Sequence, residues 1–222
     1  MSTAILFDLD GTLIDSVYQH VLAWRDALEA AGMPLAVWRI HRRIGMSGGL
    51  FVSALARETG RSLSPAEVAQ MQEEHGKAYL RYSAQVRPLP GARELLAYLA
   101  EENVPYAIAT SGYRIAATVS TKILGVGPGV PIITRDQVPH AKPDPDLFLA
   151  AADALGVSIE HSIVAGDSIW DLLAARRARA LGVGLLSGGY GVDELQSAGA
   201  YRVYEDPADL LAHLDEVGIR RG

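Results

Sequence analysis

The sequence has 222 residues and no cysteine, which excludes disulfide bonds, zinc sites built on thiolates and catalysis by a thiol. Long apolar runs are also missing. Stretches without Asp, Glu, Lys or Arg, such as residues 44–56, reach 13 residues and contain glycine, short of the roughly 20 residues of a membrane span. Basic residues are few, because 20 Lys and Arg stand against 26 Asp and Glu and give a net charge of -6. We therefore expect neither a membrane span nor a general attraction to nucleic acid.

The N-terminus lacks the basic segment and the long apolar run of a secretory signal, so we expect a cytoplasmic protein. The composition excludes disorder, since 49% of the residues are hydrophobic and 21% are charged, which provides apolar surface for a sizeable core. The acidic balance also sets a condition on function. An anionic substrate would have to meet local cations that overcome the global negative charge.

Short apolar runs alternate with helical patterns along most of the chain. The first run, Ala4–Phe7, ends at a polar residue, as a buried parallel strand does. Four similar runs follow, at residues 104–109, 130–133, 162–165 and 183–186. Helical patterns, for example at residues 92–102 and 145–155, lie between them. This alternation predicts an α/β fold with a parallel sheet and helices on both faces.

Residues 16–86 interrupt the alternation with three amphipathic helical patterns in succession and no convincing strand. The first pattern repeats apolar residues at helical spacing from Val17. The third begins at Ser64 with a Ser-x-x-Glu capping pattern. An inserted helical domain explains the interruption best. We predict a core domain of residues 1–15 and 87–222 and a helical cap domain of residues 16–86.

The most informative segment, Asp8-Leu9-Asp10-Gly11-Thr12, directly follows the first strand. It lies at the carboxyl end of that strand, where parallel sheets form their binding crevices. Two carboxylates at strand spacing point the same way, which is electrostatically costly unless a cation or a shared proton holds them. The segment therefore indicates a metal site with an acid–base role. An ordinary Asp-Gly turn is the alternative interpretation.

Three further segments place polar residues at other strand ends. Thr110 and Ser111 follow the second apolar run, so hydroxyls and backbone N–H groups lie at the same sheet edge. Lys142, one of three lysines, precedes a proline-stiffened loop, which suits an ammonium group that binds phosphate. Asp167 follows a further strand, and Asp171 lies one helical turn beyond it. Each residue could instead be a helix cap or a surface charge, but four coincidences in this order favour one site.

These four segments resemble the four motifs of the haloacid dehalogenase superfamily, and the resemblance covers nearly the whole chain. The matching residues are Asp8-Leu-Asp-Gly-Thr, Thr110, Lys142-Pro-Asp-Pro and Gly166-Asp-x-x-x-Asp171. Within the superfamily the chain is most similar to phosphoglycolate phosphatase-like and beta-phosphoglucomutase-like members. The resemblance implies a Rossmann-like core with an inserted helical cap, Mg2+ as cofactor, and phosphoryl transfer through an aspartyl-phosphate. We expect a small phosphorylated metabolite as substrate, and a monomer or weak homodimer.

The resemblance also implies a catalytic role for the first two carboxylates. Asp8 would be the nucleophile and Asp10 the general acid and base. Thr110, Ser111 and Lys142 would bind the transferring phosphoryl group. A carboxylate attacks a phosphate ester only when the charges of both are neutralised, and the lysine and a divalent cation would do this.

The implied metal site uses oxygen ligands alone. Mg2+ would be held by Asp8, by the backbone carbonyl of Asp10 and by Asp167, with Asp171 supporting the site. Oxygen ligands without His or Cys favour Mg2+ over zinc or copper. The cation would also provide the local positive charge that an anionic substrate needs in a chain with a negative net charge.

In the cap, His20, Arg43 and Met46 are candidates for substrate contact. His20 is either a hinge residue that touches the substrate or a helix-surface histidine without a role, and we favour the second interpretation. Lys77, the only lysine of the cap, is interpreted as a solvated helix charge.

Other chemistries are less consistent with the sequence. Dehalogenases of this superfamily lack the second aspartate, Asp10. Phosphonate hydrolases use a cap lysine, which the stretch of residues 43–49 lacks. Sugar phosphomutases, the main alternative, carry Ser-Arg where this chain has Ser47-Gly48. A non-catalytic phospho-acceptor module explains neither the cap nor Asp10. We predict a Mg2+-dependent phosphatase.

Overall fold

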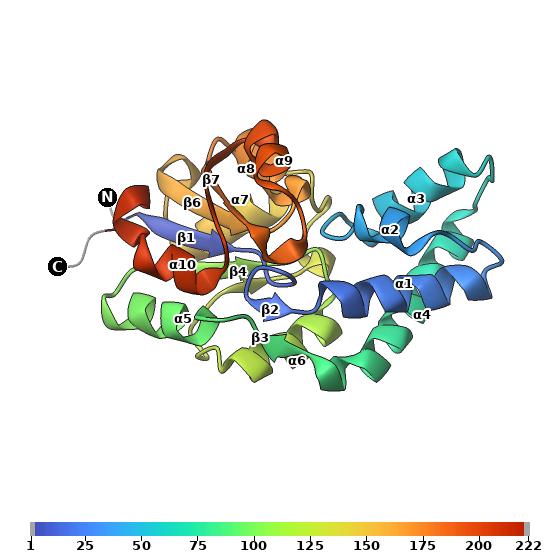
Figure 1. Ribbon diagram of the computed structural model, residues 1–222, viewed down its shortest axis with the longest axis horizontal. Helices are drawn as coiled ribbons and strands as arrows, with labels where there is room; N and C mark the ends of the chain where they lie inside the picture. The colour runs from blue at the N-terminus through green and yellow to red at the C-terminus, as the bar shows by residue number, and fades with distance from the viewer. Residues whose placement is uncertain (1–2, 220–222) are drawn as a thin grey trace.

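The computed structural model describes residues 3–219, and its centre is a six-stranded parallel sheet (Figure 1). The strand order is β5-β4-β1-β6-β7-β8, so the first strand of the chain lies inside the sheet. The strands are β1 (Ala4–Phe7), β4 (Tyr106–Ala109), β5 (Ile132–Ile133), β6 (Ser162–Gly166), β7 (Leu181–Leu185) and β8 (Ala200–Tyr204). The predicted α/β fold with a parallel sheet is confirmed.

Helices cover both faces of the sheet. One face carries α5 (Ala92–Glu101), α6 (Arg114–Leu124) and α10 (Pro207–Ala212), and the other carries α7 (Asp146–Leu155), α8 (Ile169–Ala178) and α9 (Val192–Ala198). Successive strand residues point to opposite faces. In β1, Ile5 and Phe7 accordingly pack in one apolar cluster and Leu6 in the other. A strand buried on both faces explains why its sequence is an unbroken apolar run.

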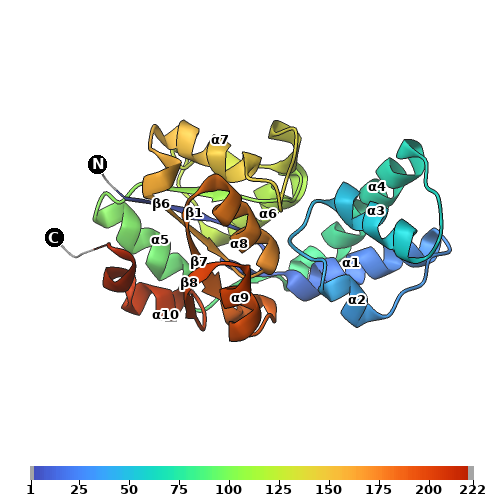
Figure 2. The same ribbon diagram turned by 90° about the horizontal axis from the view of Figure 1, so that it is seen from above.

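Four further helices form a separate packed unit beside the sheet (Figures 1 and 2). They are α1 (Val17–Ala30), α2 (Val37–His41), α3 (Gly48–Glu58) and α4 (Pro65–Tyr82). Their apolar faces enclose their own cluster of side chains, which includes Trp24 and Phe51. α4 begins with the predicted capping box, in which the Glu67 N–H donates to the Ser64 hydroxyl at 3.3 Å and the Ser64 N–H donates to the Glu67 carboxylate at 2.7 Å.

Two expectations about element number were wrong. The sheet has a sixth strand, β8, because an edge strand with exposed Tyr201 and Arg202 side chains does not form an apolar run. The helical unit has four helices instead of three, because α2 spans only 5 residues and is too short to show a periodic pattern. Among the described residues, no helix is both long and apolar enough to cross a bilayer.

The chain passes twice between the sheet and the helical unit, and the two passages lie side by side. They pair as the antiparallel strands β2 (Ile14–Asp15) and β3 (Arg87–Pro88), with Ile14 opposite Pro88. We propose that the cap comprises residues 16–86, as the sequence predicts, with this short ribbon at its base.

Candidate active site

Three neighbouring strands bring the predicted site residues to one edge of the sheet. Asp8 follows β1, Thr110 follows β4 and Asp167 follows β6, and β1 lies between the other two strands. The backbone holds these ends in place, since the Asp8 N–H donates to the Ala165 carbonyl at 2.9 Å and the Thr110 N–H donates to the Ile133 carbonyl at 2.9 Å. The parallel pairing therefore assembles residues that are distant in the sequence.

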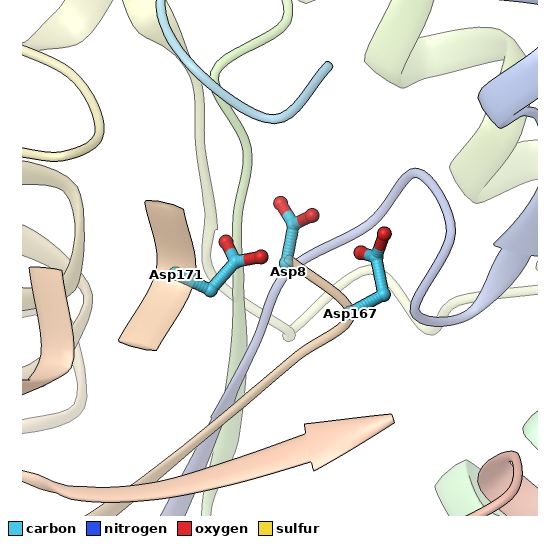
Figure 3. Close-up of side chains that lie close together, drawn as sticks. All are labelled: Asp8, Asp167 and Asp171. Atoms are coloured by element: carbon cyan, nitrogen blue, oxygen red, sulfur yellow. The ribbon is translucent and has the colours of Figure 1, made fainter. Parts of the chain in front are cut away.

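A cluster of three buried carboxylates forms at this edge. Asp8, Asp167 and Asp171 each offer an oxygen, and these atoms lie within 4.8 Å of one another. Figure 3 shows Asp8 between the other two side chains. The ammonium group of Lys142, which is completely buried, forms an ion pair with Asp8 and lies 2.8 Å from Asp171 Oδ1. Asp171 also accepts from the Ser168 hydroxyl at 2.6 Å, which fixes its carboxylate.

Burial and mutual repulsion disfavour the charged carboxylates. Burial is the largest cause and, with the charges of Asp171 and Asp10, raises the pKa of Asp8 to about 7 although Lys142 opposes the shift. Burial and the charges of Asp171 and Asp8 likewise raise the pKa of Asp167 well above 3.8. Burial lowers the pKa of Lys142, but the two carboxylates outweigh it and the net shift is upward. One lysine thus leaves the cluster short of positive charge.

The cluster fits a hard divalent cation. Its donor set consists of oxygens, which Mg2+ prefers, and a dication would compensate the negative charge that Lys142 leaves. The Asp167 carboxylate is oriented by the Thr12 hydroxyl, which donates to Oδ1 at 2.9 Å. It also lies directly against Gly188, where an added Cβ would overlap it. The contacts with Thr12 and Gly188 therefore fix the position of the Asp167 carboxylate.

The Asp10 carboxylate is not part of this cluster and lies toward the helical unit. Its Oδ1 accepts from the Ser16 hydroxyl at 2.6 Å and lies 3.3 Å from His20 Nε2. Burial raises the pKa of Asp10, but the charge of His20 and hydrogen bonds from His20 and Ser16 outweigh burial, so the net shift is downward. The two aspartates of the first motif thus occupy different electrostatic environments.

The loop after β4 offers hydroxyl groups to an anion. The Thr110 hydroxyl accepts from the Gly112 N–H at 2.9 Å, which leaves its own hydrogen free to donate. The Ser111 hydroxyl oxygen is buried and has no hydrogen-bond partner within residues 3–219. Buried polar atoms are nearly always paired, so this oxygen fits the role of a ligand contact.

A cavity of about 460 Å³ lies between these loops and the helical unit. Asp8, Asp10, Thr110 and Ser111 line its core side. Lys142, Asp167 and Asp171 lie behind Asp8 and are not among the lining residues. On the cap side, side chains come from α1, from α4 and from the loop before α3, and they include His20, Trp24, Arg43, Met46, Gln72, His75, Lys77 and Tyr79. The volume lies within the range of about 300–1,000 Å³ typical of small-molecule sites.

The interpretation of His20 as a helix-surface residue is wrong. Its side chain is only 7% exposed, and Nδ1 lies 3.1 Å from His75 Nε2. The ring also stacks on Tyr79 with a centroid distance of 4.0 Å, while the His75 ring stacks on Trp24 at 4.1 Å. We did not predict His75 and Tyr79. Their spacing of four on α4 places them on one helix face, which is the only sign of them in the sequence.

The other cap candidates also line the cavity, and different contacts hold their side chains. The Arg43 guanidinium is held by an ion pair with Glu58, whereas Met46 packs against the apolar cluster of the cap. Lys77 is half exposed, as a solvated helix charge would be, but it also lines the cavity, where Glu73 and Glu74 pair with it at 2.8 and 2.9 Å.

The cap is seated against the core through the segment of residues 41–47. The Ser47 N–H donates to the Lys142 carbonyl at 3.1 Å, and the Tyr190 hydroxyl donates to the Arg42 carbonyl at 2.8 Å. Arg42 also forms an ion pair with Glu194 and is not among the residues that line the cavity. This arrangement covers the reacting groups.

The family model of the haloacid dehalogenase-like hydrolases matches residues 3–179. The chain belongs to this family. This hydrolase is 33% identical over 193 residues to a phosphoglycolate phosphatase of Neisseria meningitidis, and the match covers 83% of this chain and 80% of the relative. It is 56% identical to a hydrolase of known structure from Pseudomonas syringae, with a TM-score of 0.95 over 98% of this chain and 100% of that one.

A beta-phosphoglucomutase structure from Clostridium difficile has a TM-score of 0.84 over 97% of this chain and 96% of that one, at 24% identity. This likeness concerns the fold alone. The predicted membership of the haloacid dehalogenase superfamily is confirmed, as is the similarity to phosphoglycolate phosphatases. This hydrolase is a phosphoric monoester hydrolase.

Proposed function

We propose that the protein is a Mg2+-dependent phosphatase that hydrolyses the phosphate monoester of a small metabolite through an aspartyl-phosphate on Asp8. The observation that carries this proposal is the placement of Asp8, which lines the cavity in front of Lys142 while Asp10 stands apart from the carboxylate cluster. A nucleophile and a separate acid–base group are what two-step hydrolysis requires.

In the first step an oxygen of Asp8 attacks phosphorus, and the bond from phosphorus to the ester oxygen breaks. The Lys142 ammonium neutralises the nucleophile as it approaches the anionic ester, and Thr110 and Ser111 hydroxyls donate to the phosphoryl oxygens. The departing oxygen takes its proton from the protonated form of Asp10, which is the minor form of this carboxyl group at neutral pH because its pKa is lowered. Because Ser16 and His20 hold Oδ1, Oδ2 is the oxygen left for this transfer.

In the second step Asp10 takes a proton from water, which attacks the phosphoryl-Asp8 and releases phosphate. Mg2+ held by Asp8, the Asp10 carbonyl and Asp167 would neutralise charge on the transferring phosphoryl group. Asp171 positions Lys142 at 2.8 Å and supports this arrangement. We expect a monomer or weak homodimer as the working form.

Phosphate release tests the proposal. Purified protein should release phosphate from a panel of sugar, polyol and carboxylic acid phosphates with Mg2+, and excess chelator should abolish release. Acid quenching with labelled substrate should trap a phosphoprotein that Asp8→Asn does not form. Full turnover in chelator, or a labelled Asp8→Asn protein, would contradict the mechanism. A stable stoichiometric phosphoprotein without turnover would favour a regulatory module instead.

A further inference from the structure

The cap side of the cavity offers no uncompensated cation to a substrate. Within the described residues that line the cavity, Arg43 and Lys77 are the only arginine and lysine. Arg43 is paired with Glu58, and Lys77 is paired with both Glu73 and Glu74. Of these three carboxylates only Glu73 lines the cavity itself, but each of the two cations has a carboxylate partner.

The histidines of the cap do not reverse this balance. Burial and the charge of His20 hold the pKa of His75 well below 6.5, so its ring is neutral at pH 7. His20 itself faces the Asp10 carboxylate at 3.3 Å. A carboxylate or second phosphate on the leaving group would lose water on entering the cavity and would find no free cation there.

The rest of the cap-side wall suits an uncharged group with an apolar face. Leu80 lines it with an apolar side chain that is 45% exposed, and Gln72 adds a neutral side chain with both donor and acceptor atoms, whereas the Trp24 and Tyr79 rings are buried beneath His75 and His20. On the core side, Tyr113 and Ile115 also line the cavity and remain 44% and 70% exposed. Large apolar side chains that stay exposed beside a cavity are typical of ligand-binding surfaces.

We propose that this phosphatase selects monoesters whose leaving group is uncharged and partly apolar, such as a polyol or sugar alcohol, and disfavours esters that carry a second anionic group. This inference rests on the proposed function and narrows it to a substrate class. The phosphoryl group would meet Lys142 and the proposed Mg2+ in the core, whereas the leaving group meets only cap cations that already have carboxylate partners.

Matched substrate pairs test the selection, because each pair differs only in the replacement of a CH2OH group by a carboxylate. The pairs are 2-hydroxyethyl phosphate with phosphoglycolate, and sorbitol 6-phosphate with 6-phosphogluconate. We expect kcat/KM to favour the uncharged member of each pair by about tenfold or more. Equal values, or a preference for the carboxylate in both pairs, would overturn the inference while leaving the phosphatase activity in place.

Two variants test whether the paired cations cause this selectivity, because each removes a carboxylate partner and keeps Arg43 and Lys77 in place. Glu58→Gln frees Arg43, and Glu73→Gln leaves Lys77 with one carboxylate. Both glutamates are exposed, so we expect the variants to fold. Each should raise the relative kcat/KM of the carboxylate substrate by about two- to fivefold, and the double variant should raise it further.

Glu29→Gln is the control, since Glu29 is an exposed glutamate of the same cap that does not line the cavity. It should leave the ratio within each pair unchanged. An equal change in Glu29→Gln would mean that overall charge, and not the cavity wall, sets the preference, and would refute the inference. No phosphate release from any of the four esters or from p-nitrophenyl phosphate would instead refute the proposed function, and the inference with it.

Discussion

Replacement of the buried Asp8 by asparagine should abolish turnover and, in the metal-free protein, raise the free energy of unfolding at neutral pH. Burial, with the charges of Asp171 and Asp10, raises the pKa of Asp8 from 3.8 to about 7 against the opposing effect of Lys142. The ionised carboxylate is therefore less stable in the folded chain than in the unfolded chain. Asparagine keeps the shape of the side chain and removes this charge.

The sign of the pH dependence follows from the two pKa values. Below pH 3.8 both states hold the proton, and Asp8 costs no stability. Between pH 3.8 and about 7 the unfolded chain releases its proton first, so the free energy of unfolding falls as pH rises. The rise of the pKa from 3.8 to about 7 lowers the stability by about 4 kcal/mol above pH 7.

Urea unfolding in chelator, followed by circular dichroism across this pH range, measures the effect. Wild type should lose stability as pH rises, and Asp8→Asn should lose less. The exposed Asp153→Asn, at a position away from the cluster, should behave like wild type. Added Mg2+ should stabilise wild type more than Asp8→Asn, because ligand binding to the folded state adds to its stability. The reasoning is refuted if Asp8→Asn has the pH slope of wild type, or is the less stable protein above pH 7.

Three further substitutions separate the parts of the site. Asp10→Asn should still form the phosphoprotein from p-nitrophenyl phosphate, because this leaving group needs no proton. The variant should hydrolyse the phosphoprotein slowly. Acid-quench labelling that finds no phosphoprotein would contradict the role assigned to Asp10. Tyr190→Phe removes the hydrogen bond to the Arg42 carbonyl, worth about 0.5–1.5 kcal/mol, so kcat/KM should fall two- to tenfold by a common factor across substrates; a substrate-dependent change would mean that Tyr190 affects specificity. Gly188→Ala should displace the Asp167 carboxylate, because the added Cβ would overlap it. The Mg2+ concentration for half-maximal activity should then rise by about tenfold or more. An unchanged Mg2+ titration would show that Asp167 does not hold the ion.

The chemical residues could be predicted from the sequence because parallel strands fix where their ends lie. An apolar run that ends in Asp8, and another that ends in Thr110, must meet at one sheet edge once both strands are parallel neighbours. Lys142 was harder to place, since it lies on a loop, and its complete burial against Asp8 is a property of the assembled fold.

The cap contacts could not be predicted in the same way. His75 and Trp24 have the spacing of ordinary buried helix residues, and only the packing of α1 on α4 brings the two rings together. The interpretation of His20 failed for the same reason, because its partner Asp10 belongs to the core and the contact depends on how the cap is seated. Helix periodicity predicts which face of a helix is buried, but it does not predict which residues that face contacts.

The negative net charge of the chain is compatible with an anionic substrate because charge compensation here is local. Lys142 is buried at the reacting end of the cavity, where low dielectric strengthens its interaction with Asp8 and with the phosphoryl group. Arg43 and Lys77, at the cap end, are already paired with carboxylates. Lys142 is paired as well, with Asp8 and Asp171, so the difference between the two ends depends on the proposed Mg2+, which would add positive charge at the phosphoryl end alone. Because the two sets of charges belong to different segments of the chain, substitutions in the cap can change which ester is hydrolysed while the residues that carry out phosphoryl transfer stay the same.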